Sequence, residues 1–210
     1  MKKLILLSSA LMLALPAAAS AATTINATVA PAAYAGPAPT YDFETLAPIG
    51  GGTVRSSDID SIAKRPTSST GNYYAVGGAA ENGTPAILSL ASFLKIGSVS
   101  FLWGTPDTYN IFEVLNGAGD AIATYNGGQI QGLTGSTTAT ALVTLNFSDA
   151  TVDNVKALRF SSSQAAFEFD NVAVAAVPEP GIWAMMLLGF AAIGFSLRRR
   201  DSAQQRVRFA

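Results

Sequence analysis

Short apolar runs, broken every few residues by glycine, asparagine, aspartate or serine, fill residues 41–174. Several runs alternate between apolar and polar residues, so that Val99, Phe101 and Trp103 share one face of an extended chain. Val143, Leu145 and Phe147 repeat that scheme. No helical period is sustained long enough for a major helix. This pattern predicts an all-β domain.

We expect nine strands, at residues 41–46, 73–77, 86–91, 97–103, 109–115, 121–125, 141–147, 156–161 and 166–174. Residues 116–120 read as a hairpin turn, and Asn126 with Gly127 and Gly128 ends the strand that follows. So many strands in about 135 residues favour a two-sheet β-sandwich of the jelly-roll type over residues 41–176. Residues 22–40, rich in Ala, Pro and Thr, form a loose leader or a first edge strand.

The charge of the chain is unevenly distributed. The whole chain has a net charge of −1, but residues 22–177 hold six basic and twelve acidic residues, a net charge of −6. An acidic domain lacks the clustered cations that nucleic-acid binding requires. The chain has no cysteine and no histidine. Disulfides, thiolate chemistry, histidine-based triads and zinc sites are therefore excluded, and a hard cation such as calcium is the metal that the remaining oxygen ligands suit.

The N-terminus has the three parts of a secretory signal peptide. Lys2 and Lys3 precede an apolar core over residues 4–15, and Pro16 leads into small residues that include Ala19 and Ala21. The apolar core is too short to span a bilayer. We therefore expect residues 1–21 to be a helical signal peptide that signal peptidase removes.

The C-terminus has a different three-part order. A proline-flanked glutamate comes first, an uncharged and mostly apolar run ends at Leu197, and three arginines follow at once. The prolines favour an extended, exposed chain that does not join the helix behind it. Arginines gather on the cytoplasmic side of a span, so residues 201–210 read as a basic cytoplasmic tail and the run before them as a single transmembrane helix. The residues that carry this order are Pro178, Glu179, Pro180, Trp183, Ala184, Arg198, Arg199 and Arg200.

This order resembles the PEP-CTERM sorting signal, in its PEPxxWA variety, over residues 177–200. The resemblance implies a Gram-negative bacterial protein that an exosortase, a membrane-embedded cysteine transpeptidase, recognises and processes. It implies passage through the inner membrane, then residence at the cell surface, in the outer envelope or in the extracellular matrix. The tail beyond Arg200 is longer than usual for the family. The alternative is a plain single-span anchor behind an accidental Pro-Glu-Pro linker.

A second resemblance rests on two short stretches, residues 99–110 and 167–172. They are similar to stretches of exosortase-dependent surface proteins whose exported part is a lectin-like β-sandwich. The resemblance implies that fold over residues 41–174 and implies no biochemical activity.

One candidate site joins the first predicted strand to the last. Asp42 and Glu44 open the domain and Asp170 with Asn171 closes it, and such segments often lie side by side in jelly rolls. These oxygens are the ligands of a structural calcium site. The alternative, which we favour, is that Asp170 and Asn171 end a strand and Glu44 faces solvent.

Another candidate is the loop from Trp103 to Asn110. Trp103, Asp107, Tyr109 and Asn110 offer stacking and hydrogen bonds to a sugar, which predicts contact with an exopolysaccharide or envelope glycan. The alternative, which we again favour, is that Trp103 is a core residue and the rest form a turn that contains a proline.

Glycoside hydrolysis requires only two carboxyl groups at a defined separation, so the lack of histidine does not exclude it. The carboxyl groups from which such a pair would come are Glu113, Asp120, Glu168 and Asp170. Any acidic domain offers such pairs, and we predict no enzymatic activity and no resident cofactor apart from the calcium alternative. The sequence predicts an exported surface or matrix protein of biofilm and exopolysaccharide, with a carbohydrate-binding module as the rival interpretation.

Overall fold

A computed structural model of the protein describes residues 23–77, 83–148, 154–177 and 180–206. The predicted signal peptide, together with Pro178 and Glu179 of the predicted sorting signal, lies outside the described residues.

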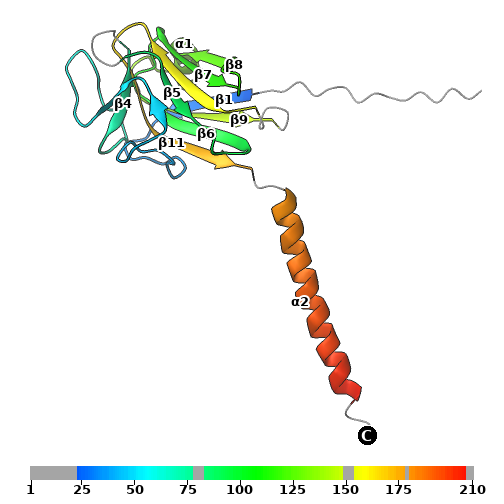
Figure 1. The fold of residues 1–210 in the computed structure, drawn as a ribbon. Helices are drawn as coiled ribbons and strands as arrows, with labels where there is room; N and C mark the ends of the chain where they lie inside the picture. Colours follow the sequence, from blue (N-terminus) through cyan, green and yellow to red (C-terminus); the bar gives the residue numbers. More distant parts are fainter. Residues whose placement is uncertain (1–22, 78–82, 149–153, 178–179, 207–210) are drawn as a thin grey trace, which may run out of the picture.

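The described strands form two antiparallel sheets that face each other as a β-sandwich (Figure 1). The six-stranded sheet has the order β1-β9-β6-β11-β4-β3 and consists of β1 (Thr23–Val29), β3 (Thr53–Arg55), β4 (Tyr73–Val76), β6 (Ile96–Trp103), β9 (Ala141–Phe147) and β11 (Phe167–Ala176). The five-stranded sheet has the order β2-β5-β10-β7-β8 and consists of β2 (Ile49–Gly50), β5 (Ala86–Ser89), β7 (Asn110–Leu115), β8 (Ala121–Asn126) and β10 (Ala157–Ser162). From β4 onward the chain changes sheet at every connection except the β7–β8 hairpin.

Eight of the nine predicted strands are present, with ends that differ by two residues or fewer. The predicted strand at residues 41–46 is wrong. It contributes a single bridge, between Tyr41 and Val172, because the next residue but one, Phe43, has a positive φ of 58° that turns the chain out of an extended path. The prediction also lacks the short strands β2 and β3.

The leader is the first edge strand over part of its length. β1 pairs with β9 along all seven of its residues, from Thr23 opposite Phe147 to Val29 opposite Ala141. The sandwich therefore includes residues that the sequence assigns to a separate leader.

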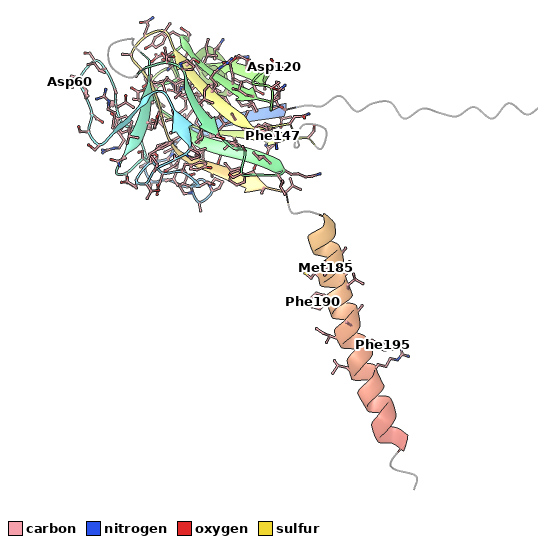
Figure 2. The ribbon with its side chains drawn as sticks, viewed as in Figure 1. Asp60, Asp120, Phe147, Met185, Phe190 and Phe195 are labelled. Atoms are coloured by element: carbon pink, nitrogen blue, oxygen red, sulfur yellow. The ribbon has the colours of Figure 1, made fainter. Side chains whose placement is uncertain are left out.

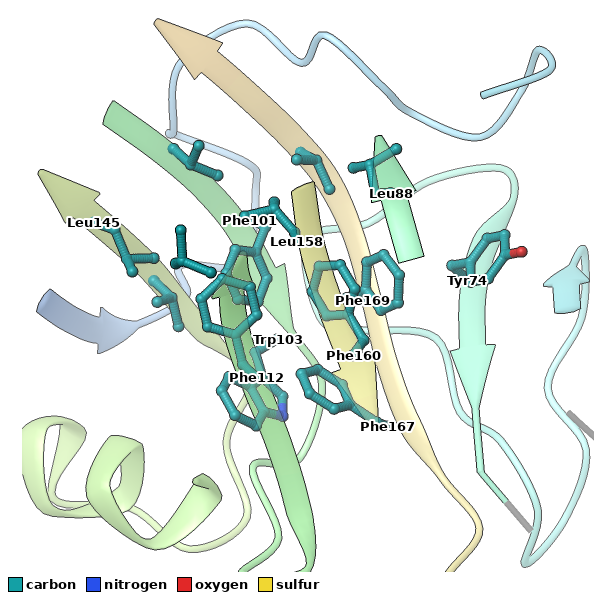
Figure 3. Close-up of a cluster of buried hydrophobic side chains, with 14 of the residues drawn as sticks. Tyr74, Leu88, Phe101, Trp103, Phe112, Leu145, Leu158, Phe160, Phe167 and Phe169 are labelled. Carbon is teal, nitrogen blue, oxygen red and sulfur yellow. The ribbon is translucent and has the colours of Figure 1, made fainter. Parts of the chain in front are cut away.

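Aromatic side chains from both sheets fill the space between them (Figure 3). Trp103 of β6 lies parallel to Phe167 of β11, with ring centroids 4.2 Å apart. Phe160 of β10 lies parallel to Phe169 of β11 at 3.8 Å, which joins the two sheets. The predicted inward face of β6 is confirmed, since Val99, Phe101 and Trp103 are fully buried.

The outer face of the six-stranded sheet is also covered. Tyr73 and Ala75 of β4 point away from the main core and pack with Ala63 and Ala166 in a second apolar cluster. The Tyr73 hydroxyl donates to the Ser57 carbonyl oxygen at 3.1 Å. The segment before β4 therefore folds back over this sheet, and buries side chains that a two-layer sandwich leaves exposed.

A short helix, α1 (Gly127–Thr134), follows β8 where the sequence predicts only a turn. Asn126 caps it: its side chain accepts from the Gln129 amide at 3.0 Å, while the Gln129 side chain accepts from the Asn126 amide at 2.9 Å. Gly135 ends the helix with a φ of 69°. Gln131 donates from Nε2 to the Pro106 carbonyl oxygen at 2.8 Å, so α1 supports the loop before β7.

The C-terminal helix, α2 (Pro180–Arg206), projects away from the sandwich (Figures 1 and 2). Pro180 starts the helix rather than preceding it, which corrects the prediction; proline suits the first helical position because no partner awaits its missing N–H. The helix continues past Leu197 and through the arginines. The large apolar side chains Met185, Phe190 and Phe195 are exposed along it.

Among the described residues, no helix combines the length and the apolar character needed to cross a membrane. The predicted span up to Leu197 is therefore not confirmed.

Candidate functional site

Two of the four residues predicted to contact a glycan are structural. Trp103 is 0% exposed and lies in the aromatic core. Asn110 is also fully buried: it donates to the carbonyl oxygens of Thr105 at 3.4 Å and Ala166 at 3.3 Å, and its Oδ1 accepts from Ser162 at 2.7 Å. These bonds fix the loop before β7 to the end of β10 and the start of β11. Neither side chain is placed to meet a ligand from solvent.

The other two residues lie at a pocket. Asp107 is half-buried and lines a cavity of about 360 Å³, and Tyr109 donates from its hydroxyl to Asp107 Oδ2 at 2.9 Å. Burial raises the pKa of Tyr109 to about 12, and the hydrogen bond to Asp107 adds to the effect. The phenol is therefore a permanent donor at neutral pH, and it orients the carboxylate beside it.

Three separated parts of the chain form this pocket, which we call the Glu168 pocket. Residues 58–64 make one wall, Thr105 and Asp107 make another, and Ala165 with Ala166 and Glu168 closes it. A tight turn shapes the first wall, since the Ile59 amide donates to the Ala63 carbonyl oxygen at 2.8 Å. Asp58 accepts from the Arg65 amide at 2.8 Å, which holds the end of that turn in place.

Glu168 is the buried member of the pocket. It sits on the outer face of β11 opposite Ala75, is 7% exposed, and accepts from the Lys64 amide at 3.0 Å through Oε1. Burial raises the pKa of its carboxyl to about 7, the Lys64 amide opposes that rise, and Asp107 and Asp58 add to it. The predicted candidate for acid–base chemistry is thus a carboxyl group that titrates near neutral pH.

The residues of the calcium prediction lie close together, on the same outer face. The Tyr41–Val172 bridge brings Asp42 beside the middle of β11, and Asp42, Glu44 and Asn171 line a second pocket with Ser69. Asp170 is fully buried next to it: its Oδ2 accepts from Ser69 at 2.6 Å, and its buried Oδ1 has no partner in the described residues. Burial, with smaller contributions from Asp42 and Glu44, raises the pKa of Asp170 to about 7, although hydrogen bonds from Ser69 and the Asn171 amide oppose the rise.

In the part of the chain that the structure describes, no three His, Cys, Asp or Glu side chains converge as metal ligands would. The calcium site stays a prediction. The competing interpretation is confirmed in one half, since Glu44 is exposed, and corrected in the other, because β11 does not end at Asp170 and Asn171. It passes through a bulge there, where Asn171 has a φ of 53°, and continues to Ala176.

The four carboxyl groups considered for glycoside hydrolysis do not face one another across a common cleft. Glu113 forms an ion pair with Arg159 on the five-stranded sheet, and Asp120 bonds to Asn116 in the β7–β8 turn. In Figure 2, Asp120 and Asp60 of the Glu168 pocket lie at opposite sides of the sandwich. Glu168 and Asp170 share one face of β11, but Glu168 lines the first pocket, whereas Asp170 accepts a hydrogen bond from Ser69 of the second. Absence of enzymatic activity stays a prediction.

The last residues of the sandwich meet the predicted sorting signal without a spacer. β11 ends at Ala176, and the Val177 amide donates to the Lys95 carbonyl oxygen at 3.1 Å. The model of the PEP-CTERM protein-sorting motif matches residues 176–200. The chain carries a PEP-CTERM sorting motif. This motif implies processing by an exosortase, and it implies an exported protein that is associated with the cell surface.

No curated protein sequence matches the chain. Two solved structures are similar to it in fold. The family 11 carbohydrate-binding module of the cellulosomal cellulase Lic26A-Cel5E from Clostridium thermocellum is 14% identical with a TM-score of 0.36, over 67% of this chain and 95% of the module. The enzymatically active domain of tailspike protein 4 from bacteriophage CBA120 is 11% identical with a TM-score of 0.34, over 74% of this chain and 19% of the tailspike chain. Likenesses this weak say nothing of what the PEP-CTERM protein binds.

The pocket walls are what the sequence interpretation missed. Residues 58–64 fall between predicted strands and have no motif or period of their own. Ser69, which bonds to Asp170, is equally unmarked. Only the fold of the segment before β4 brings them to β11, and no local pattern reports that packing.

Proposed function

We propose that this PEP-CTERM protein is a non-enzymatic surface or matrix protein of a Gram-negative envelope, displayed in exopolysaccharide or biofilm. Signal peptidase removes residues 1–21 on export. The chain then rests at the inner membrane until an exosortase acts at Pro178, Glu179 and Pro180. The exported part is a lectin-like jelly roll, a class that the two antiparallel sheets support.

One observation carries this proposal: the sorting motif follows the folded domain directly. The last backbone hydrogen bond of the sandwich is made by Val177, and the motif's first proline is the next residue. Cleavage at the motif separates α2 from the rest and leaves every described strand in the released part. α2 projects away from the sandwich and carries exposed apolar side chains, which fits a segment used only for sorting.

The test is to recover the protein from the cell surface and medium and to determine both termini by intact-mass and peptide mass spectrometry. We expect a chain that begins near Ala22 and ends near Pro180. Glu179→Ala and Pro180→Ala should each leave an unprocessed membrane form, whereas Asp120→Ala, in an exposed turn of the sandwich, should be processed normally. A mature chain that keeps Arg198 and its neighbours would contradict the proposal.

A second candidate function is glycan binding by the sandwich. The observation in its favour is the Glu168 pocket, since Asp107 of the predicted loop lines it and Tyr109 of the same loop donates a hydrogen bond to Asp107. The open face of the five-stranded sheet is a poorer candidate: Ile87, Ile111 and the Arg159–Glu113 ion pair lie along its outward side, and no aromatic ring of β5, β7, β8 or β10 stacks there. Saturable binding of the producing cell's own exopolysaccharide, with no turnover, tests this candidate.

A further inference from the structure

The Glu168 pocket has the size of a site for a small ligand. Its volume of about 360 Å³ falls within the range of about 300–1,000 Å³ that ligand pockets occupy. The first wall is a turn closed by its own backbone bonds, and α1 supports the second through Gln131 and Pro106. A pocket built from fixed walls loses little entropy when a ligand enters.

One carboxyl oxygen of Glu168, Oε2, is free to accept a hydrogen bond from a ligand. Lys64 donates its amide to Oε1, and no hydrogen bond within the described residues reaches Oε2. The side chain is more than nine-tenths buried, yet it lines the pocket. Oε2 is not among the fully buried polar atoms that lack a partner, so this oxygen is open to the pocket, from which a ligand or water can donate to it.

Neither of the basic side chains at the contact with residues 64 and 65 pairs with Glu168 in the hydrogen bonds described. The Lys64 contact is made by the backbone, and its side chain is exposed. Arg65 donates to the Ser56 carbonyl oxygen at 2.6 Å and lies over the Tyr73 ring. Three further carboxyl groups line the pocket, from Asp58, Asp60 and Asp107. The pocket therefore repels anions and favours a cation.

A bare metal ion does not fit this arrangement, because no three acidic side chains of the described chain converge. A protonated primary amine needs fewer carboxyl groups than a metal ion, because one carboxylate balances its single charge and other acceptors can take its remaining N–H donors. The pocket also offers the small apolar surface of Ala63, Ala165 and Ala166 and the hydroxyl groups of Ser61 and Thr105. A ring that carries hydroxyl groups on polar edges and C–H groups on its faces matches that lining.

We infer that the Glu168 pocket binds an amino sugar with a free, protonated amine, as one unit of a cationic polysaccharide, with the ammonium group paired to Glu168. This inference rests on the second candidate function, glycan binding, and names its ligand. Asp107, held by Tyr109, accepts from a neighbouring hydroxyl or from the same ammonium group. Asp60 at the rim attracts the charged chain.

The test is calorimetric titration of the full chain, purified in detergent so that the result is independent of sorting. The probes are glucosamine oligomers, the same oligomers fully N-acetylated, glucose oligomers and an oligolysine peptide. We expect saturable binding of the glucosamine oligomers alone. Glu168→Gln keeps the bond to the Lys64 amide and should weaken binding by about thirtyfold or more, as loss of a buried charge pair does. Asp60→Asn at the rim should weaken it by about twofold to fivefold.

Glu113→Gln, on the opposite sheet, is the matched control and should leave the affinity unchanged. Near-ultraviolet circular dichroism of Glu168→Gln establishes that the variant folds, and Asp60→Asn gives an independent reading because it changes an exposed side chain. Equal binding of N-acetylated oligomers, or no effect of Glu168→Gln, would overturn the inference. Binding of oligolysine as tightly as glucosamine would overturn the assignment to a sugar.

The experiment gives different results if the amino-sugar inference is wrong and if glycan binding itself is wrong. Binding of glucose oligomers in place of glucosamine overturns the amine assignment and supports glycan binding. If none of these oligomers binds and the native exopolysaccharide does not bind either, both the inference and the second candidate fall. The proposal of a sorted surface protein is tested separately by the mapped termini.

Discussion

The outer faces of the two sheets differ in whether another part of the chain covers them. On the six-stranded sheet, the segment before β4 covers β11, so that Glu168 is 7% and Asp170 0% exposed. On the five-stranded sheet, Glu113 forms its ion pair with Arg159 in partial contact with water, and Ile111 is 40% exposed. Both outer faces carry acidic residues, Glu168 and Asp170 on β11 and Glu113 on β7. Whether such a residue is a solvated surface charge or a buried group with a raised pKa depends on what lies above the sheet.

The largest expected difference between the faces concerns their apolar residues. Tyr73→Ala removes a fully buried ring beneath the cover and should lower the free energy of unfolding by about 3–5 kcal/mol. Ile111→Ala on the open face should lower it by about 0.5 kcal/mol or less. Urea unfolding of both variants measures the difference.

Tyr73→Phe is the matched control, because it keeps the ring and loses only the bond to the Ser57 carbonyl oxygen, at about 1 kcal/mol. Similar losses for Tyr73→Ala and Ile111→Ala would mean that the segment before β4 does not cover the sheet in solution.

The second prediction concerns pH. Glu168 and Asp170 have ordinary pKa values of 4.5 and 3.8, and burial raises both to about 7 in the folded protein. The folded state then binds more protons than the unfolded state between these values, so stability is greatest below about pH 4 and is lost as pH rises through about 7. The loss should be on the order of 1–3 kcal/mol for each group.

Glu168→Gln removes one of these groups and should flatten the decline, leaving the variant more stable than the native protein at pH 8 and nearly equal to it at pH 4.5. Urea unfolding at a series of pH values measures this. Glu113→Gln on the open face should keep the native slope. An unchanged slope in Glu168→Gln would show that its carboxyl is solvated.

The division between what the sequence predicts and what it leaves out follows the range of the interactions. Alternation places Val99, Phe101 and Trp103 in the core, because side-chain direction along a strand is a local property. The same alternation places Glu168 on the face of β11 that points away from Phe167 and Phe169. It does not indicate whether solvent reaches that face. The covering segment is joined to β11 by contacts such as Lys64 to Glu168, 104 residues apart in the chain.

Two errors have different origins. The prediction of a strand at residues 41–46 is wrong because Phe43 has a positive φ, which is uncommon for phenylalanine and is not indicated by the sequence. α1 is missed although its signals are present, since Asn126 and Gln129 have the spacing of a capping box and Gly135 follows. The capping residues therefore predict this helix despite the Gly127–Gly128 pair. No comparable local signal predicts the Glu168 pocket.

The third prediction concerns calcium binding on the covered face. If Asp42, Glu44 and Asp170 bind the ion, their side chains must turn toward one another, and the buried charge of Asp170 is compensated. At a calcium concentration of about 100 times the dissociation constant, the stabilisation should be about 2.7 kcal/mol. Thermal unfolding with calcium, with magnesium and with a chelator measures it.

Asp170→Asn should abolish the response to calcium, while Asp120→Asn in the exposed hairpin turn should retain it. An unchanged midpoint in calcium would mean that buried Asp170 and exposed Asp42 and Glu44 do not bind the ion.

The smallest expected effect belongs to the open face. Arg159 donates to Glu113 from Nε at 2.6 Å and from Nη2 at 2.7 Å, so the pair is bidentate and joins neighbouring strands. Water screens it, since the two side chains are 31% and 14% exposed, and a double-mutant cycle of Arg159→Met with Glu113→Gln should give a coupling of about 0.2–1 kcal/mol. That coupling should shrink in high salt. A coupling above about 2 kcal/mol that salt does not change would mean that this pair is as shielded from water as Glu168. The five-stranded sheet would then be covered in solution as well, and the two outer faces would not differ.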